Sequence, residues 1–279
     1  MIEVTPHTNN FGAAINGVDL SALSTQDITE IRQAWLDHQV IYFPNQPLDH
    51  EQLQQFTQSF GDFGHDPYVK PIDGHPHVLE VRREANEKVA PFGNSWHSDW
   101  SFQAAPPAAT ILHSKVIPPH GGDTHYADGI RAYESLDTQM AADLDNLVAL
   151  HSARRPYSHE GYERSGGPER SMTILPNDDA WEVQEHPLVR THPESGRRAL
   201  WVNPVYTIGV KGLSEEESDS LLKMLFAHTL KDEFIYRHKW SANMLTMWDN
   251  RSVQHCAQGG YDGHQRVLHR TVVAGNEPY

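Results

Sequence analysis

The sequence predicts a mainly β fold with flanking α-helices, of the β-sandwich or jelly-roll type. Short strand-like runs recur along the chain, separated by Pro- and Gly-rich turns such as residues 105–109 and 118–122. Only a few segments have the apolar spacing of a helix. With 279 residues the chain is within reach of one hydrophobic core. We therefore expect a single domain spanning residues 1–279, in which sheets are decorated by helices.

Four segments are predicted to be helical, and two of them open with a residue suited to cap a helix. Ser24 and Asp49 have short polar side chains that can accept hydrogen bonds from a first helical turn, and Gly61 can end the second segment. The predicted helices span residues 24–39, 49–61, 129–145 and 214–230.

The predicted strands are short and mostly rich in Val, Ile, Thr and aromatic residues. The clearest strand-like runs are residues 40–46, 77–82, 96–102, 110–117, 123–128, 233–240, 244–257 and 266–275, and residues 186–204 read as a hairpin. Within 244–257, the stretch WDNR (248–251) is predicted to turn the chain into the strand that carries His255. Residues 153–181 are polar, Gly/Pro-rich and without period, which is typical of either a lid or a plain surface excursion.

Charge and cysteine usage limit the classes of partner. There are 22 basic and 37 acidic residues, a formal net charge of −15, which disfavours nucleic acid and anionic membrane surfaces. Cys256 is the one cysteine, so no internal disulfide can form. No signal peptide and no apolar run long enough to span a membrane are visible. We expect a soluble cytoplasmic protein whose anionic ligands, if any, are captured by local arginines.

The stretch WHSDWSF (96–102) contains the first candidate metal ligands. On a strand, His97 and Asp99 would project from the same face and supply two of the three ligands of a 2-His-1-carboxylate iron site. With 19 histidines in the chain such a pair is weak on its own, since most His-x-Asp pairs are surface hydrogen bonds. His255 is the candidate third ligand, and the neighbouring Cys256 should point away from the metal.

Two arginines on the final predicted strand are candidate anion-binding residues. Arg266 and Arg270 would share a face, with Leu268 between them. A guanidinium presents a planar fork to a carboxylate, although two solvated surface charges remain the alternative interpretation. Trp96, Trp100 and Phe102 are expected to pack around the His97 and Asp99 pair.

Several of these stretches, in this order, resemble one known family. WHSDWSF, GGDTHYAD, HPLVRTHPESGRRALW, WDNRSVQH and RVLHRTVVAG are similar to motifs of the taurine dioxygenase / 2,4-dichlorophenoxyacetate dioxygenase family. The likeness covers nearly the whole chain. It implies a double-stranded β-helix (jelly-roll, cupin-like) core, Fe(II) as metal, 2-oxoglutarate as co-substrate and ascorbate as a reductant in vitro. It also implies consumption of O2, release of succinate and CO2, and a homodimer or homotetramer.

The resemblance also implies a role for each matched residue. His97, Asp99 and His255 would bind iron, Arg266 and Thr124 the distal carboxylate of 2-oxoglutarate, and Arg270 the anionic head of a small substrate. That substrate would be a carboxylate, sulfonate, sulfate, phosphonate or aryloxyacetate.

Two positions depart from the taurine enzyme. Gly93 stands where that enzyme has a taurine-binding Asn. His65, a further candidate for substrate binding, is one residue out of step with a second taurine contact, and Asp66 is at the strict match. These departures argue against taurine itself as the substrate. The HSDWSFQ and PLVRTHPESGRRALW stretches are more similar to the aryloxyacetate branch of the family.

Two other classes of function remain open on the residues alone. One is a metal-dependent hydrolase or isomerase that uses the same ligands on the same barrel. The other is a binding protein without metal. Binding of 2-oxoglutarate would distinguish the oxygenase from both, since neither alternative needs a five-carbon diacid.

Overall fold

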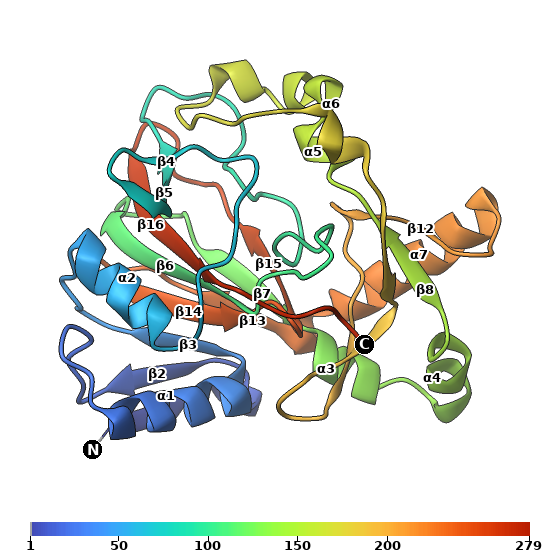
Figure 1. Cartoon of the computed structure of the whole chain (residues 1–279), viewed down its shortest axis with the longest axis horizontal. Helices are drawn as coiled ribbons and strands as arrows, with labels where there is room; N and C mark the ends of the chain where they lie inside the picture. Colours follow the sequence, from blue (N-terminus) through green and yellow to red (C-terminus); the bar gives the residue numbers. More distant parts are fainter. Residues whose placement is uncertain (1) are drawn as a thin grey trace.

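The computed structural model describes residues 2–279 as a mixed α/β, sheet-rich structure (Figure 1). The strands are β1 (Glu3–Pro6), β2 (Ala13–Asn16), β3 (Val40–Phe43), β4 (Pro71–Ile72), β5 (His75–Arg83), β6 (Ala109–Val116), β7 (Thr124–Asp128), β8 (Val148–His151), β9 (Gln184–Pro187), β10 (Val189–Thr191), β11 (Arg198–Leu200), β12 (Thr207–Val210), β13 (Ile235–His238), β14 (Leu245–Asp249), β15 (Val253–Ala257) and β16 (Arg266–Val273). The helices are α1 (Thr25–His38), α2 (His50–Gln58), α3 (Gly129–Glu134), α4 (Thr138–Leu144), α5 (Arg154–Tyr157), α6 (His159–Arg164) and α7 (Glu215–Thr229). Four 3₁₀ turns complete the elements: η1 (Thr8–Asn10), η2 (Gly167–Glu169), η3 (Asp178–Trp181) and η4 (Asp232–Phe234).

An eight-stranded sheet with the order β1-β2-β3-β14-β6-β16-β5-β4 is the main structural layer. Its neighbours pair antiparallel except for β2 and β3, which are parallel. A three-stranded sheet, β13-β7-β15, faces it, and another, β12-β8-β9, lies farther along the chain. Among the described residues these sheets do not close into a barrel.

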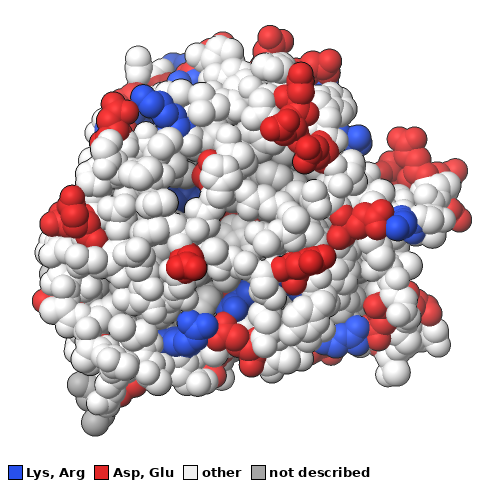
Figure 2. Space-filling view, viewed as in Figure 1, with Lys and Arg blue, Asp and Glu red and all other residues white. Residues whose placement is uncertain are grey.

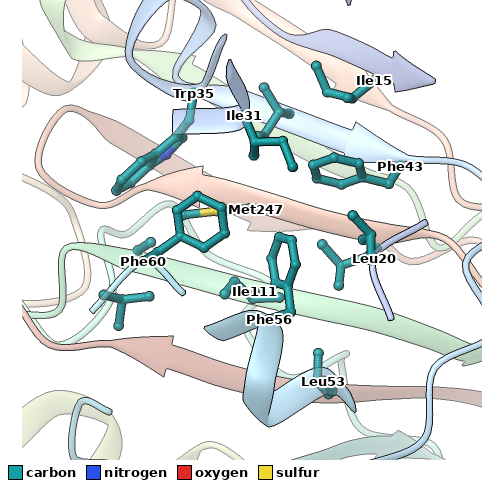
Figure 3. Close-up of a cluster of buried hydrophobic side chains, with 14 of the residues drawn as sticks. Ile15, Leu20, Ile31, Trp35, Phe43, Leu53, Phe56, Phe60, Ile111 and Met247 are labelled. Carbon is teal, nitrogen blue, oxygen red and sulfur yellow. The ribbon is translucent and has the colours of Figure 1, made fainter. Parts of the chain in front are cut away.

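Alternation along the central strands divides the two faces of the large sheet between two cores. Ile111 and Met247 face helices α1 and α2 in the cluster drawn in Figure 3, where Trp35 and Phe56 cover them. The residues next to them in sequence, such as Trp248, face the β13-β7-β15 sheet instead. The space between the two sheets is therefore where inward-pointing polar groups of β6, β7, β15 and β16 meet.

The helix predictions were largely confirmed and both predicted N-terminal caps are present, but Gly61 does not end the second helix, because α2 stops at Gln58 with Ser59 as its C-cap. Ser24 and Asp49 each accept a hydrogen bond from the third residue of α1 and α2, and that residue's side chain binds back to the cap. The region 129–145 is helical but divides into α3 and α4, because Asp137 caps a new helix there. Residues 214–230 contain α7, capped by Ser214.

The strand prediction for residues 96–102 was wrong. Only His97 is in a β-bridge, with His255, and the rest of the stretch is a loop. Trp100 has a φ of +46°, a left-handed conformation that ends the extended run directly after Asp99. The close approach of His97 and Asp99 therefore does not come from the alternation of side chains along a strand.

Residues 153–181 fold over one end of the sheets as α5, α6, η2 and η3 (Figure 1). Val69 and Ile174 form an isolated antiparallel bridge, so the segment is joined to the chain that precedes β4. A second attachment joins it to the loop after β5, where the backbone amide and hydroxyl of Ser171 donate to the carboxylate of Glu87.

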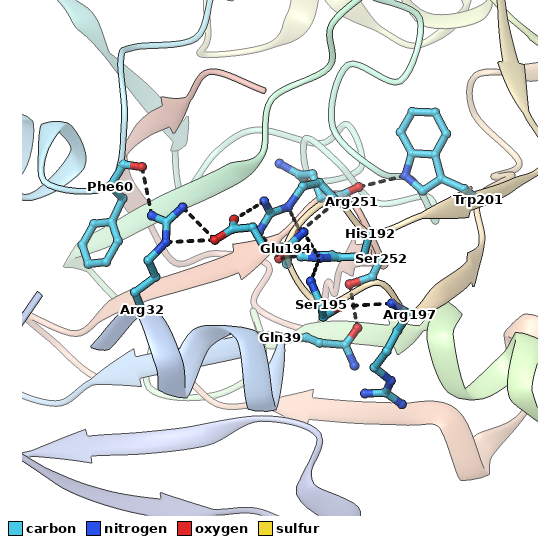
Figure 4. Close-up of polar contacts among 12 residues, drawn as sticks. Arg32, Gln39, Phe60, His192, Glu194, Ser195, Arg197, Trp201, Arg251 and Ser252 are labelled. Carbon is cyan, nitrogen blue, oxygen red and sulfur yellow. Dashed lines mark hydrogen bonds and ion pairs between the residues drawn. The ribbon is translucent and has the colours of Figure 1, made fainter. Parts of the chain in front are cut away.

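A buried ion network joins α1, the β10–β11 turn and the turn between β14 and β15 (Figure 4). Arg251 bonds to Asp249 and to Glu194, and Glu194 also accepts from Arg32 of α1. His192 Nδ1 accepts from the backbone amides of Glu194 and Ser195, so its Nε2 donates to the same Asp249 carboxylate at 2.9 Å. The predicted turn at 248–251 is partly right: Trp248 and Asp249 end β14, and residues 250–252 make the turn, which the charged side chains of Asp249 and Arg251 fix to the rest of the fold.

The outer surface carries mostly acidic charge, as the composition predicts. Figure 2 shows carboxylates scattered over the visible face with fewer Lys and Arg groups. Within residues 2–279 no helix is both long and apolar enough to cross a membrane.

Candidate active site

The structure brings His97, Asp99 and His255 together between the two facing sheets. One ligand atom from each of these buried residues lies within 4.8 Å of the other two. His97 Nε2 is 3.5 Å from Asp99 Oδ1, and His255 Nε2 is 3.9 Å from Asp99 Oδ2. Within residues 2–279 this is the one set of three such groups with metal-ligand spacing.

Backbone pairing, rather than a shared strand, sets the spacing of the two imidazoles. The amide of His97 donates to the carbonyl of His255 at 3.0 Å, and the reverse bond measures 2.8 Å. Their ring centroids are consequently 4.2 Å apart. The His97–His255 bridge adds one residue pair to the edge of β15 and so fixes the loop that carries Asp99. This explains how a loop can place both His97 and Asp99 next to His255.

Hydrogen bonding and burial leave both imidazoles able to bind a metal. His97 Nδ1 lies 2.6 Å from the carbonyl of Ser95, which can only accept, so the proton is on Nδ1 and Nε2 keeps its lone pair. Burial, with His97 next to it, lowers the pKa of His255 well below its usual value. His255 is therefore neutral at pH 7 and needs no deprotonation before it binds a metal.

Asp99 is held by a chain of polar side chains from β6 and the β14–β15 turn. Thr110 donates to Asp99 Oδ2 at 2.6 Å, and Asn250 donates to Thr110 at 2.8 Å. Asp99 Oδ1 has no hydrogen-bond partner among the described residues. Burial alone would raise the pKa of Asp99, but Arg270 and the two imidazoles more than offset it and hold the pKa below its usual range. The carboxylate is thus ionised and oriented, and its Oδ1 forms an ion pair with Arg270 rather than a hydrogen bond.

Arg266 lies behind the three ligands with its guanidinium largely unpaired. It is 6% exposed, and its Nε and Nη2 atoms have no hydrogen-bond partner among the described residues. It lines a small cavity together with Thr124, His97, Asp99 and His255. A buried cation without a partner is costly, so this position favours an anion that enters the cavity.

The neighbours of Arg266 help to place it. Trp240 donates its indole N–H to the hydroxyl of Thr124 at 3.0 Å, so the Thr124 hydroxyl proton remains available to a second acceptor. Gly122 has a φ of +70°, and a Cβ there would lie 3.1 Å from Arg266 Nε. The glycine in the GGDT stretch therefore allows both the turn and the close approach of the guanidinium.

Arg270 lies on the same face of β16, nearer to the three ligands. Its Nη2 is 3.2 Å from Asp99 Oδ1, and its guanidinium carbon is 4.7 Å from the centre of the Trp100 ring. Burial would lower its pKa, but Asp99 and Asp66 raise it above the usual value. Its Nε makes no hydrogen bond to any described residue, which leaves a donor for a ligand.

His65 and Asp66 are placed differently from each other. The carbonyl of His65 accepts from Gln103, while its side chain is exposed and lines neither cavity of the site. Asp66 accepts two backbone bonds, from Tyr68 and Val69, and its second oxygen is buried without a partner. Burial raises the pKa of Asp66 to about 6 although Arg270 opposes this rise.

A larger cavity of about 530 Å³ opens beside His97. Phe92, Trp100, Tyr157, Tyr162 and Tyr206 give it an aromatic wall, and Ile174 and Val205 add aliphatic surface. Part of this wall comes from residues 153–181. Phe92, Gly93 and His97 also line the smaller cavity, so the two spaces meet next to the candidate metal ligands.

Comparison with known proteins identifies the family. The family model described as taurine catabolism dioxygenase TauD, TfdA family matches residues 3–272. The chain belongs to this family. It is 33% identical over 282 residues to an alpha-ketoglutarate-dependent sulfate ester dioxygenase of Pseudomonas putida, covering 99% of this chain and 91% of that protein.

Two further likenesses agree with the TauD, TfdA assignment. An alpha-ketoglutarate-dependent 2,4-dichlorophenoxyacetate dioxygenase of Cupriavidus pinatubonensis is 32% identical, with 94% of each chain covered. The crystal structure of a taurine dioxygenase from Burkholderia xenovorans superposes with a TM-score of 0.82 and 33% identity, covering 99% of this chain and 92% of that one. The protein is therefore an enzyme of the alpha-ketoglutarate (2-oxoglutarate)-dependent dioxygenase class.

The sequence did not reveal which residues support the ligands in this TauD, TfdA family member. Thr110 looks like any buried strand threonine, and Asn250 was assigned only to the turn. Trp240 belongs to no recognisable sequence motif. The one available signal was the Asn in WDNR, since a buried amide must find partners across the turn. Cys256 is buried and burial raises the pKa of its thiol to about 11, which agrees with the expectation of an inert thiol.

Proposed function

We propose that this protein is an Fe(II)- and 2-oxoglutarate-dependent dioxygenase that hydroxylates an organic anion with a sizeable apolar body. One observation carries the proposal: a buried His97–Asp99–His255 set adjoins two buried guanidinium groups, each of which keeps its Nε and Nη2 donors without a hydrogen-bond partner among the described residues. The overall reaction would convert substrate, 2-oxoglutarate and O2 into hydroxylated product, succinate and CO2. No feature of the site favours a hydrolase or a metal-free binding protein.

The donor set fits a divalent iron ion. Two imidazoles and one carboxylate are the ligands of the facial site used by non-haem Fe(II) oxygenases, and they leave three coordination positions for other ligands. The Oδ1 of Asp99 accepts no hydrogen bond from a described residue, although Arg270 lies 3.2 Å away, and this supports its role as a ligand because a metal ion could bind it. When bound there, Fe(II) supplies the redox chemistry that activates O2 toward a nearby C–H bond.

Arg266 and Thr124 are our candidates for binding 2-oxoglutarate. The cavity behind the ligands offers two free guanidinium donors and the Thr124 hydroxyl, a combination that matches a carboxylate with several lone pairs. Such a carboxylate would be the anionic partner that the buried Arg266 lacks among the described residues. A carboxylate held at this end would direct the keto acid of the same molecule toward His97, Asp99 and His255.

Arg270 and the larger cavity are our candidates for binding the substrate. The guanidinium would hold the anionic head, while the aromatic wall would exclude water from the apolar body. Relatives are named for sulfate esters, sulfonates and aryloxyalkanoates. A cavity of about 530 Å³ is far larger than a two-carbon sulfonate needs, which favours an alkyl sulfate ester or an aryloxyacetate.

Four further features belong to the same proposal. The two facing sheets would be the halves of a double-stranded β-helix, or jelly roll, within one domain. Residues 153–181, which supply Tyr157 and Tyr162 to the cavity wall, would act as its lid. A homodimer or homotetramer in the cytoplasm is the expected state, and ascorbate would serve as a reductant in vitro. His65 stays a prediction as a substrate-binding residue.

Succinate release tests the proposal. The full-length protein would be given Fe(II), 2-oxoglutarate and ascorbate with a panel of alkyl sulfates, alkylsulfonates, phosphonates and aryloxyacetates of increasing size. We expect strong stimulation by a bulky member and little by taurine. Arg270→Met should lose this stimulation and keep slow succinate release without substrate, whereas His97→Ala should lose both. No succinate from protein that has bound iron would contradict the proposal.

A pair of neighbouring variants tests the substrate contact. His65→Ala and Asp66→Asn change adjacent residues. Only Asp66 has a buried oxygen and an electrostatic interaction with Arg270. We expect the KM of the best substrate to change in Asp66→Asn. A change in His65→Ala alone would assign the contact to His65.

A further inference from the structure

A group of histidines lies on the opposite side of the large sheet from the candidate active site. This outer histidine cluster consists of His50 at the start of α2, His75 at the start of β5, and His269 on β16. His269 alternates with Leu268 and Arg270, so it faces outward under α2 while they face the two-sheet interior. The cluster has no part in the proposed oxygenase chemistry.

Two nitrogen atoms of the cluster face each other at close range. His50 Nε2 lies 3.0 Å from His269 Nδ1, and the ring of His75 is 4.4 Å from that of His50. In the metal-free protein one of the two facing nitrogens donates a hydrogen bond to the other. The same separation also suits two ligands of one ion, because metal–nitrogen bonds of about 2.0–2.1 Å at about 90–110° put the nitrogens roughly 3 Å apart.

A carboxylate selects the tautomer of His269 that metal binding requires. Glu80 Oε2, itself held by Arg82, lies 3.8 Å from His269 Nε2 on the neighbouring strand. Attraction to Glu80 favours the proton on Nε2 and leaves the Nδ1 lone pair directed at His50. A histidine whose far nitrogen faces a carboxylate is the usual arrangement behind metal-bound imidazoles.

The charges around the cluster permit a cation. Lys115 opposes a cation, but its ammonium group is directed at the carbonyl of Leu48. Asp49, Glu51 and Glu80 supply three nearby carboxylates against two cations, Lys115 and the Arg82 that binds Glu80.

We infer that the outer histidine cluster binds Zn²⁺ or Ni²⁺ through His50 and His269, with His75 as the third ligand. Imidazole donors without a ligating carboxylate suit these ions, and affinity rises along the first-row series past Fe²⁺. The ion would tie α2 to β16, the strand that carries Arg266 and Arg270. His75 must turn its ring toward the ion, since its nitrogens do not join the other two within metal-ligand spacing in the metal-free protein.

Zinc stoichiometry tests this inference independently of oxygenase activity. Metal-stripped full-length protein would be titrated with Zn²⁺ against a chromophoric chelator, with anomalous diffraction at the zinc edge to locate each ion. We expect two tightly bound equivalents in the wild type, one in His50→Ala, one in His97→Ala and none in the double variant. His77→Ala removes a nearby exposed histidine that stacks on Phe63 and should keep two equivalents.

Two outcomes would overturn the inference. One is a single equivalent in the wild type that is lost in His97→Ala, and the other is an outer equivalent that survives in His50→Ala. In either case the His50–His269 contact is a hydrogen bond only, and His50→Ala would lower the melting temperature without changing zinc binding. If His50→Ala does not fold, Glu80→Gln replaces it, because losing the supporting carboxylate should weaken the outer equivalent about 10- to 100-fold.

Discussion

Asp99 connects the three functions proposed for the site, because it contacts His97, a candidate metal ligand, Arg270, a candidate substrate-binding residue, and the hydroxyl of Thr110. Its Oδ1 faces His97 and Arg270, and its Oδ2 accepts from Thr110. Once a metal binds Oδ1, the ion competes with Arg270 for that oxygen. We therefore expect metal binding to free Arg270 for the substrate anion.

The support from Thr110 should be measurable as metal affinity. Thr110→Val keeps the shape of the side chain but removes the hydrogen bond to Asp99 and one partner of Asn250. We expect Fe(II) to bind about 10- to 100-fold more weakly, as for other groups that orient a metal ligand. Thr246→Val removes a buried hydroxyl from the next strand and serves as the control. Unchanged affinity in Thr110→Val would show that Asp99 needs no support.

The geometry of Arg266 should matter more than its charge. Arg266→Lys keeps the cation but loses the planar fork that suits a carboxylate. Loss of a charge-assisted hydrogen bond of about 1.5–3 kcal/mol should raise the KM for 2-oxoglutarate by roughly tenfold to a hundredfold. Arg237→Lys, at an exposed ion pair with Asp232, should leave this KM unchanged. An equal effect in both variants would contradict the assignment of Arg266.

At the scale of elements, the sequence predicted correctly those features that depend on residues close together in the chain. The caps Ser24 and Asp49 specify the starts of α1 and α2, because a side chain within three residues satisfies the first amides. Residues 96–102 alternate like a strand but pair only through His97. Their conformation depends on β15, which lies about 150 residues away in sequence, and on the left-handed turn at Trp100. No local pattern could reveal either.

The buried His113 of β6 should make stability depend on pH. Its Nε2 lies 2.7 Å from the carbonyl of Gln46, and burial, reinforced by Lys115 and His50, lowers its pKa from 6.5 to about 4. The unfolded chain then takes up a proton first as the pH falls, so stability is lost between about pH 6.5 and pH 4. The shift corresponds to about 3 kcal/mol at most.

Chemical denaturation at a series of pH values checks this effect. His113→Gln can still donate to Gln46 but cannot titrate, so its free energy of unfolding should fall less steeply between pH 6.5 and pH 4. His159→Gln replaces an exposed histidine and is the matched control. Equal slopes for wild type and His113→Gln would contradict the assignment.

On the scale of the whole molecule, the site exists because distant segments are joined by buried polar contacts. The network of Arg251, Asp249, Glu194 and Arg32 fixes the β14–β15 turn that leads to His255. The three candidate ligands could be picked out from the sequence with the help of the family likeness, and the structure brings them within metal-ligand spacing. The supporting residues and the size of the cavity could not, because they arise from the packing of five or more separate segments.

Removing one member of this network should destabilise the whole fold. Arg251→Met leaves Asp249 buried with His192 as its main partner, and we expect a loss of about 3–5 kcal/mol in the free energy of unfolding. Lys211→Met breaks the exposed ion pair with Glu185 and should cost at most about 1 kcal/mol. Urea denaturation of the two variants measures both. Similar small losses would mean that the network is not a major support.

The most direct test of the central claim is anaerobic binding of 2-oxoglutarate to the Fe(II)-loaded protein, followed by visible absorption. We predict a new charge-transfer band that appears only when Fe(II) and 2-oxoglutarate are both present, that is lost in His255→Ala, and that needs more 2-oxoglutarate in Arg266→Lys. Iron that binds stoichiometrically without such a band would contradict the proposal that the site holds 2-oxoglutarate on the metal.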